Sequence, residues 1–256
     1  MLPEILTRLI RAANGDMMTI ASLADEVAGG HVKKFFETTQ AKLDAATAED
    51  TRDALLEMMK QVGYNATAFQ VALEVLQLLH DDVEAVKKIA AEWETRKEPQ
   101  PDFRDVVVGA TIVAPAFASS TGPIRKMYIE ALRGSYTPAI FVYGFGEELL
   151  NSLIIAKVLP VDIEGLGRLE SSSEKLDLSV MTEPPKLPPV DTSMEQRLEC
   201  FERLAHGGFV TMVQQTQTGV QLFITDRTQA TSWGINVRIT PKGRRLLTMI
   251  RAGRGE

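Results

Sequence analysis

The chain has 256 residues, of which 45% are hydrophobic and 24% are charged. This composition is typical of a soluble globular protein, and the length suffices for one large domain or two modest ones. A single cysteine, Cys200, excludes an internal disulfide and favours a reducing cytosol. The N-terminal stretch MLPEILTRLIRAANGD lacks the continuous apolar core of a signal peptide, so we expect a cytoplasmic protein.

The net charge of −6 conceals an uneven distribution of charge along the chain. From Met194 onward there are nine basic and five acidic residues, whereas the preceding residues carry 19 basic and 29 acidic ones. Six basic residues and no acidic ones lie in 238–254. Such a basic run is suited to phosphate groups or to an acidic partner surface, although a solvated final helix has the same composition.

The first third of the chain has the apolar spacing of helices. Residues 3–62 are expected to form a set of short helices, interrupted at glycine-containing turns such as Asn14-Gly15 and Gly29-Gly30. Residues 66–97 predict either one helix or a tightly joined pair; in a pair, His80-Asp81-Asp82 would mark the break and supply the new N-cap. The apolar seam of this segment consists of Phe69, Ala72, Leu76, Leu79, Val83, Val86, Ala90 and Trp93. We expect the seam to pack within its own domain, with a self-associating coiled coil as the alternative.

Residues 103–158 are apolar and rich in small residues, and three interpretations compete. A membrane element would need a longer apolar run than 106–118, which also contains Pro115. A Rossmann-like strand–helix unit, with strands at 106–113 and 139–143, would place a Gly144-Phe145-Gly146 turn against phosphate, but Glu147-Glu148 in the first helical turn opposes this. The third and favoured interpretation is a buried helical core with an amphipathic helix at 124–133.

The segment after Pro160 reads as a short helix and then a connector. Serines and doubled prolines in 171–193, such as Pro184-Pro185, indicate an extended linker. We therefore expect a helical domain at 1–170, a connector at 171–193 and a C-terminal module at 194–256. The predicted fold class is mainly α, with an α+β module at the C-terminus.

The C-terminal module has the order helix, strand pair, helix. A helix at 194–205 ends at Gly207-Gly208, strand-like runs follow at 209–215, 219–226 and 232–240, and Pro241 begins a last helix. The sequences LAHGGFV and ITPKGRRLL resemble the closing half of winged-helix folds, as found in bacterial MarR-like and ArsR-like regulators. That resemblance implies a fold, and in it the helix before the wing would enter the major groove of DNA.

The residues expected on the exposed face of that helix disfavour its insertion into the major groove of DNA. Its residues are Glu195, Gln196, Arg197, Glu199, Glu202 and Arg203, and the carboxylates among them would repel phosphate. The predicted contacts to nucleic acid or to a partner lie instead on the wing and the last helix, at Arg227, Arg238, Lys242, Arg244, Arg245, Arg251 and Arg254. A protein partner or a homo-oligomer is expected, with nucleic acid bound through its backbone as the alternative and a membrane disfavoured.

A second resemblance covers more of the chain. The order of IRKMYIEALRGS, LIIAKVLPVDIEGLGRL, FERLAHGGFV and ITPKGRRLL is similar to that of the bacterial abortive-infection alpha-type proteins, although the core helix at 127–132 departs from the family pattern. This similarity implies a link to phage defence and supplies no catalytic residue.

No catalytic, metal or cofactor site is predicted from the residues. The three histidines are far apart, and Cys200 has no histidine close in sequence, so a structural thiol is favoured over a nucleophile. We therefore predict a non-enzymatic binding or regulatory component. The alternatives are a nucleotide-processing enzyme and a membrane-active effector, both using 103–158.

Overall fold

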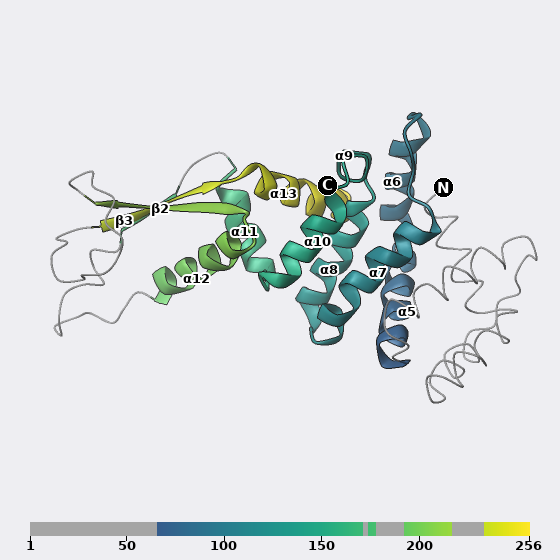
Figure 1. Ribbon diagram of the computed structural model, residues 1–256, viewed down its shortest axis with the longest axis horizontal. Helices are drawn as coiled ribbons and strands as arrows, with labels where there is room; N and C mark the ends of the chain where they lie inside the picture. Colours follow the sequence, from purple (N-terminus) through teal and green to yellow (C-terminus); the bar gives the residue numbers. More distant parts are fainter. Residues whose placement is uncertain (1–65, 171–173, 178–191, 217–232) are drawn as a thin grey trace, which may run out of the picture. The chain divides into compact units, whose positions relative to one another are not determined.

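The computed structural model describes residues 66–170, 174–177, 192–216 and 233–256. This part of the chain is mainly helical with one small antiparallel sheet (Figure 1), which confirms the predicted mainly helical class. The chain divides into two compact units, and the divisions fall within helices α10 and α13. Unit 1 comprises the residues up to Asn151 together with Met249–Glu256, and unit 2 comprises Ser152–Thr248. The helices predicted in 3–62 lie outside the described residues.

The described part of unit 1 begins with a joined pair of helices, one of the two forms that the sequence predicts for 66–97. Helix α5 spans Ala66–Asp81 and α6 spans Val83–Glu94, and the Asp82 side chain caps α6 by accepting a hydrogen bond of 3.2 Å from the Ala85 amide. Most of the described seam is buried, and Trp93 donates a hydrogen bond of 2.8 Å to the Tyr136 carbonyl. Val83 is 40% exposed, so the prediction that it belongs to the buried seam was wrong. The break at Asp82 restarts the helical phase and turns Val83 toward solvent.

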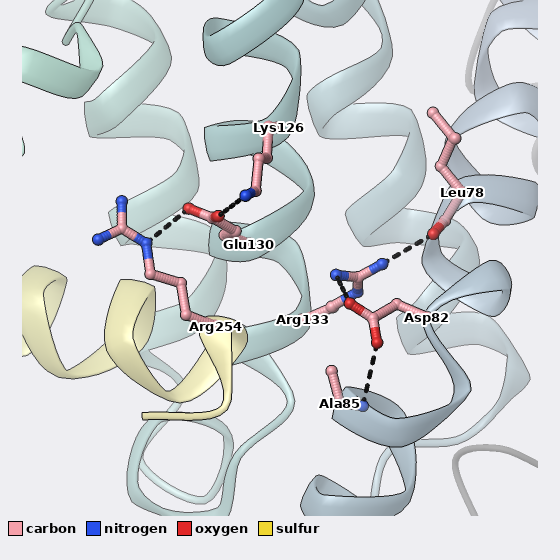
Figure 2. Close-up of polar contacts among 7 residues, drawn as sticks. All are labelled: Leu78, Asp82, Ala85, Lys126, Glu130, Arg133 and Arg254. Atoms are coloured by element: carbon pink, nitrogen blue, oxygen red, sulfur yellow. Dashed lines mark hydrogen bonds and ion pairs between the residues drawn. The ribbon is translucent and has the colours of Figure 1, made fainter.

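A buried arginine holds this break in place. Arg133, only 8% exposed, donates hydrogen bonds of 2.8 Å to the Asp82 carboxylate and 2.9 Å to the Leu78 carbonyl (Figure 2). Arg133 thereby supplies a hydrogen bond to a carbonyl in the last turn of α5. It also binds the carboxylate that caps α6. Burial lowers the pKa of Arg133, and the Asp82 carboxylate opposes that shift.

Residues 103–158 are helical, which confirms the helical-core interpretation. The helices are α7 (Phe103–Ala118), α8 (Gly122–Ser135), α9 (Pro138–Phe141) and α10 (Phe145–Ile155). The alternative strands at 106–113 and 139–143 were wrong, because a reciprocal capping box between Asp102 and Asp105 starts α7 and its apolar residues are buried at helical spacing. Among the residues that the structure describes, no helix has the length and apolar character to span a membrane.

The end of α13 (Pro241–Arg254) packs on α8 through two glycines. A Cβ on Gly134 would lie 1.7 Å from the Met249 carbonyl oxygen, and one on Gly253 would lie 1.8 Å from the Glu130 carbonyl oxygen. Since both contacts are with backbone, no side chain can move aside to admit a larger residue. The two helices therefore meet backbone to backbone in unit 1.

Unit 2 contains the sheet and the helices around it. It comprises α11 (Pro160–Arg168), β1 (Glu174–Asp177), α12 (Thr192–His206), β2 (Val210–Thr216), β3 (Trp233–Ile239) and the first part of α13, in agreement with the helices expected after Pro160 and Pro241. The strand order is β1-β3-β2, and both pairings are antiparallel. The predicted strand at 219–226 lies outside the described residues.

The small sheet includes residues from the expected connector. Strand β1 lies within 171–193 and pairs with β3 in the register Glu174 to Val237 and Asp177 to Gly234. Alternation along β3 buries Ile235 and Val237 and exposes Arg238. Residues 174–177 are thus part of the sheet of unit 2, while 178–191 lie outside the described residues.

Two helices in unit 2 end in the same left-handed turn. Gly208 has φ +75° after α12, as the paired glycines predict, and the Phe209 amide donates to the Leu204 carbonyl at 2.9 Å. Lys157 has φ +52° after α10, and the Val158 amide donates to the Leu153 carbonyl at 3.2 Å. A lysine in this conformation is costly, because its Cβ crowds the following carbonyl.

Candidate functional site

The corner between β3 and α13 is built by the sequence Thr240-Pro241-Lys242-Gly243. Thr240 accepts a hydrogen bond of 3.0 Å from the Gly243 amide and thereby caps α13, and Pro241 occupies the first helical position. The Thr240 hydroxyl also lies 2.8 Å from the Gly208 carbonyl. A Cβ on Gly243 would lie 2.2 Å from the Phe209 carbonyl oxygen, so only glycine permits this approach. These contacts fix the start of α13 against the end of α12.

Lys242 is bound into this corner. Its ammonium lies 2.7 Å from the Ser152 hydroxyl and 5.7 Å from the centre of the Phe209 ring. It is half-buried, whereas the neighbouring arginines are exposed. We therefore assign Lys242 a role in holding the start of α13, which reduces its availability to an outside ligand.

Three of the predicted binding residues are exposed on β3 and the first part of α13. Arg238 points away from the buried side of β3, and Arg244 and Arg245 lie on the solvent face of α13 together with Thr248. Arg244 donates to the Glu170 carbonyl at 3.3 Å. We call Arg238, Arg244 and Arg245 the basic surface of unit 2.

The other predicted residues are placed differently. Arg254 lies in unit 1, where its Nε donates a hydrogen bond of 2.8 Å to the Glu130 carboxylate (Figure 2). Glu130 is only 5% exposed, and its second oxygen lies 3.8 Å from the Lys126 ammonium. The Arg254 guanidinium thus neutralises a buried carboxylate. Arg251 is half-buried in the same unit, and Arg227 lies outside the described residues.

The helix before the wing has an ion pair that the sequence did not predict. Arg203 was expected to be exposed, but it donates two hydrogen bonds of 2.8 Å to both oxygens of Asp162 on α11. Asp162 is completely buried and also accepts a hydrogen bond of 2.8 Å from the Leu159 amide. The hydrogen bond to Asp162 raises the pKa of Arg203. Arg203 therefore joins α12 to α11, and the expectation that its side chain is exposed was wrong.

The remaining exposed residues of α12 keep an acidic character. Gln196, Arg197, Glu199 and Glu202 are exposed, whereas the side chain of Glu195 lies outside the described residues. With Arg203 held by Asp162, the described face offers two carboxylates and one guanidinium to solvent. Such a face is poorly suited to a groove lined with phosphate.

Cys200 lies beside the same ion pair. It is buried, and a Cβ on Gly165 would lie 3.0 Å from its sulfur. Burial raises the pKa of the Cys200 thiol to about 12, and the nearby Asp162 carboxylate adds to the shift. The thiol thus stays protonated at neutral pH, as a structural cysteine does and a nucleophile does not.

Within the described ranges, no group of three or more histidine, cysteine, aspartate or glutamate side chains is arranged to hold a metal ion. Comparisons of the chain with protein-family models, with curated proteins and with solved structures found no match.

Proposed function

We propose that this protein is a non-enzymatic, cytoplasmic binding or regulatory component that docks nucleic acid or a partner protein through a winged-helix-like module. The order of elements in unit 2 supports the proposed fold. Helix α12 leads directly into β2, β3 follows as its antiparallel partner, and β1 completes the sheet on the other side of β3. A winged helix has this arrangement of a helix followed by a β-hairpin.

The observation that carries the proposal is the separation of charge within unit 2. Arg238, Arg244 and Arg245 are exposed on β3 and α13, whereas the exposed face of α12 carries Glu199 and Glu202. Contact with phosphate groups is therefore favoured on the basic surface and opposed on α12. On this basis nucleic acid would be held by its backbone, without base reading by α12.

The similarity to the abortive-infection alpha-type proteins gives this role a context in bacterial phage defence. The matching stretches correspond to α8, to the α10–α11 region, to α12 and to α13. If the chain acts in defence, a bacterial strain that expresses it should show a lower efficiency of phage plating than the strain without it. An Arg244→Ala/Arg245→Ala variant should restore plating.

Salt-dependent binding tests the basic surface directly. We expect the wild-type chain to bind mixed-sequence duplex DNA or RNA, and the Arg244→Ala/Arg245→Ala variant to bind more weakly at low salt. If both arginines contact phosphates, the slope of log K against log salt should fall by about 1.8, at about 0.9 for each contact. The matched control is Arg96→Ala/Arg104→Ala, which removes two exposed arginines from unit 1.

The outcomes separate the two kinds of partner. An unchanged slope in the Arg244/Arg245 variant would exclude nucleic acid as the ligand of the basic surface. If duplexes and single strands do not bind at all, a pull-down with mass spectrometry should identify a protein partner that the same variant loses. Loss of neither ligand would refute the proposed role of the basic surface.

A further inference from the structure

The ribbon formed by β2 and β3 has one packed face and one outer face. The two strands run side by side (Figure 1), in the register Thr211 to Arg238 and Val213 to Asn236. Because side chains alternate along a strand, these four lie on one face, which we call the outer face of the ribbon. Thr211 and Arg238 are exposed, Val213 is 41% exposed and Asn236 is partly exposed, whereas Val237 between them is buried. The outer face thus presents a guanidinium, an amide and an aliphatic side chain.

The polar side chains of the outer face are not used by the fold. The Asn236 amide oxygen is shielded from solvent, and within the described ranges it has no hydrogen-bond partner. An unpaired buried acceptor costs free energy, and that cost is removed when the amide turns outward and pairs with a ligand. Arg238 takes part in the fold through its carbonyl, which accepts a hydrogen bond of 3.5 Å from the Thr211 hydroxyl. Its guanidinium has no ion-pair partner in the part of the chain that the structure describes.

The dimensions of the outer face match the edges of base pairs in B-DNA. The major groove is about 12 Å wide and admits a two-stranded β-ribbon, whose strands lie about 4.8 Å apart. Among the described residues, the pairing of β1 with β3 ends at Val237, so the sheet has two strands at Arg238. Side chains two residues apart on a strand are separated by about 6.8 Å, which equals two base-pair steps of about 3.4 Å each. Asn236 and Arg238 have this spacing on β3, so they can reach base pairs two steps apart.

The chemistry of these side chains matches particular bases. Arginine pairs with guanine O6 and N7 through two hydrogen bonds, and asparagine pairs in the same way with adenine N6 and N7. The thymine opposite adenine carries a methyl group, which an aliphatic side chain contacts favourably. Val213 faces Asn236 across the ribbon, so the two together suit one A·T base pair. Double-stranded RNA is disfavoured, because side chains cannot read its narrow major groove.

We propose that the outer face of the ribbon reads sequence in the major groove of duplex DNA. Arg238 binds a guanine, and Asn236 with Val213 binds an A·T pair two steps away. Charge complementarity selects this occupant, since the described side chains of the outer face include a guanidinium and no carboxylate. The inference rests on the proposed function and adds sequence specificity to it: Arg244 and Arg245 hold phosphates, while the ribbon supplies the base reading that the carboxylates of α12 oppose.

Selection from a random-sequence duplex DNA library with the full-length chain tests this proposal. We expect enrichment of a guanine and an adenine two base-pair steps apart. Asn236→Ala should weaken binding to the enriched duplex by about 5- to 150-fold, the range of one bidentate base contact. The same variant should bind a mixed-sequence duplex as the wild type does, which also shows that it is folded. Arg238→Ala should remove the preference for guanine, whereas Arg244→Ala/Arg245→Ala should weaken binding to all duplexes alike.

The matched control is Gln196→Ala, which removes an exposed amide from α12 and should leave both the enriched sequence and the affinity unchanged. An adenine preference that survives in Asn236→Ala, or that disappears in Gln196→Ala, would overturn the proposal. Binding that depends on Arg244 and Arg245 but enriches no sequence would overturn the base reading and leave the proposed docking of nucleic acid intact. If no duplex binds, the base reading and the docking of duplex DNA are both refuted.

Discussion

The ion pair between Asp162 and Arg203 should be the most sensitive point in unit 2. In Arg203→Met the aliphatic stem remains, but Asp162 loses both guanidinium hydrogen bonds and keeps the one from the Leu159 amide and its interaction with the Cys200 thiol. Removal of one partner from a buried pair costs about 3–5 kcal/mol, because the other charge is left without compensation. We expect about 3 kcal/mol, the lower end of this range, since the Arg203 side chain is 26% exposed and water can enter where it was.

Replacement of the other partner, Asp162, should lower the free energy of unfolding by less. In Asp162→Asn the side chain keeps its shape, and the partly exposed Arg203 guanidinium can turn to water. We expect a loss of about 1.5–2 kcal/mol, the value of a hydrogen bond to a charged group. The double variant should be more stable than the sum of the two losses predicts, with a coupling energy of about 1–2 kcal/mol.

Urea unfolding followed by far-ultraviolet circular dichroism measures these free energies, and hydrogen exchange should show the loss of protection in α11 and α12. Arg197→Met provides the matched control, because Arg197 is exposed on the same helix and its replacement should change the free energy of unfolding by about 0.5 kcal/mol or less. A loss in Arg203→Met no larger than that of this control, or additive effects of the two substitutions, would show that the buried ion pair does not stabilise unit 2.

Three further changes test other features of the fold. Lys157→Gly should stabilise the protein by up to about 1 kcal/mol, because Lys157 has φ +52° and glycine adopts this conformation without strain; a thermal melt that does not rise would contradict this. Gly134→Ala should destabilise it by about 1–3 kcal/mol or more, since the new Cβ meets the Met249 carbonyl, and an unchanged urea midpoint would show that α8 and α13 can separate at no cost. Raising the pH from about 9 to 10 should lower the free energy of unfolding by up to about 1.4 kcal/mol through Cys200, because its folded pKa is raised and the unfolded state loses its proton first. The slope over this interval should decrease in Cys200→Ala, and equal slopes in both proteins would exclude the thiol as its cause.

Features set by neighbouring residues were predicted well from the sequence. His80-Asp81-Asp82 was named as the place of a break with a new N-cap if 66–97 formed two helices, and the Asp82 carboxylate is that cap. The Gly207-Gly208 pair was expected to end α12 in a left-handed turn, and Gly208 has the required positive φ. In such cases the residues that determine the structure lie within one helical turn, so the local sequence contains the necessary information.

Predictions failed where distant segments decide the outcome. Arg203 has the spacing of an exposed residue, but its partner Asp162 is on another helix, and the sequence around Arg203 contains no sign of it. The prediction of Arg254 as a binding residue did not anticipate that its guanidinium donates a hydrogen bond to Glu130 of α8. Val83 fits the apolar seam by counting residues, but the break at Asp82 changes the phase. Each error comes from a contact or a change of direction that periodicity does not report.

The glycine contact between α8 and the end of α13 has a consequence for synthesis. Gly134 and Glu130 meet residues 249–253, although all of unit 2 lies between them in the sequence. During translation, all of unit 2 is synthesised before this contact partner of α8. Until then the face of α8 around Gly134 remains open, and Glu130 lacks the Arg254 guanidinium. The packing of α8 against residues 249–253 therefore waits until unit 2 has been synthesised, and a nascent chain stalled before Met249 should be cleaved by proteases within unit 1 more readily than a chain that includes 249–256.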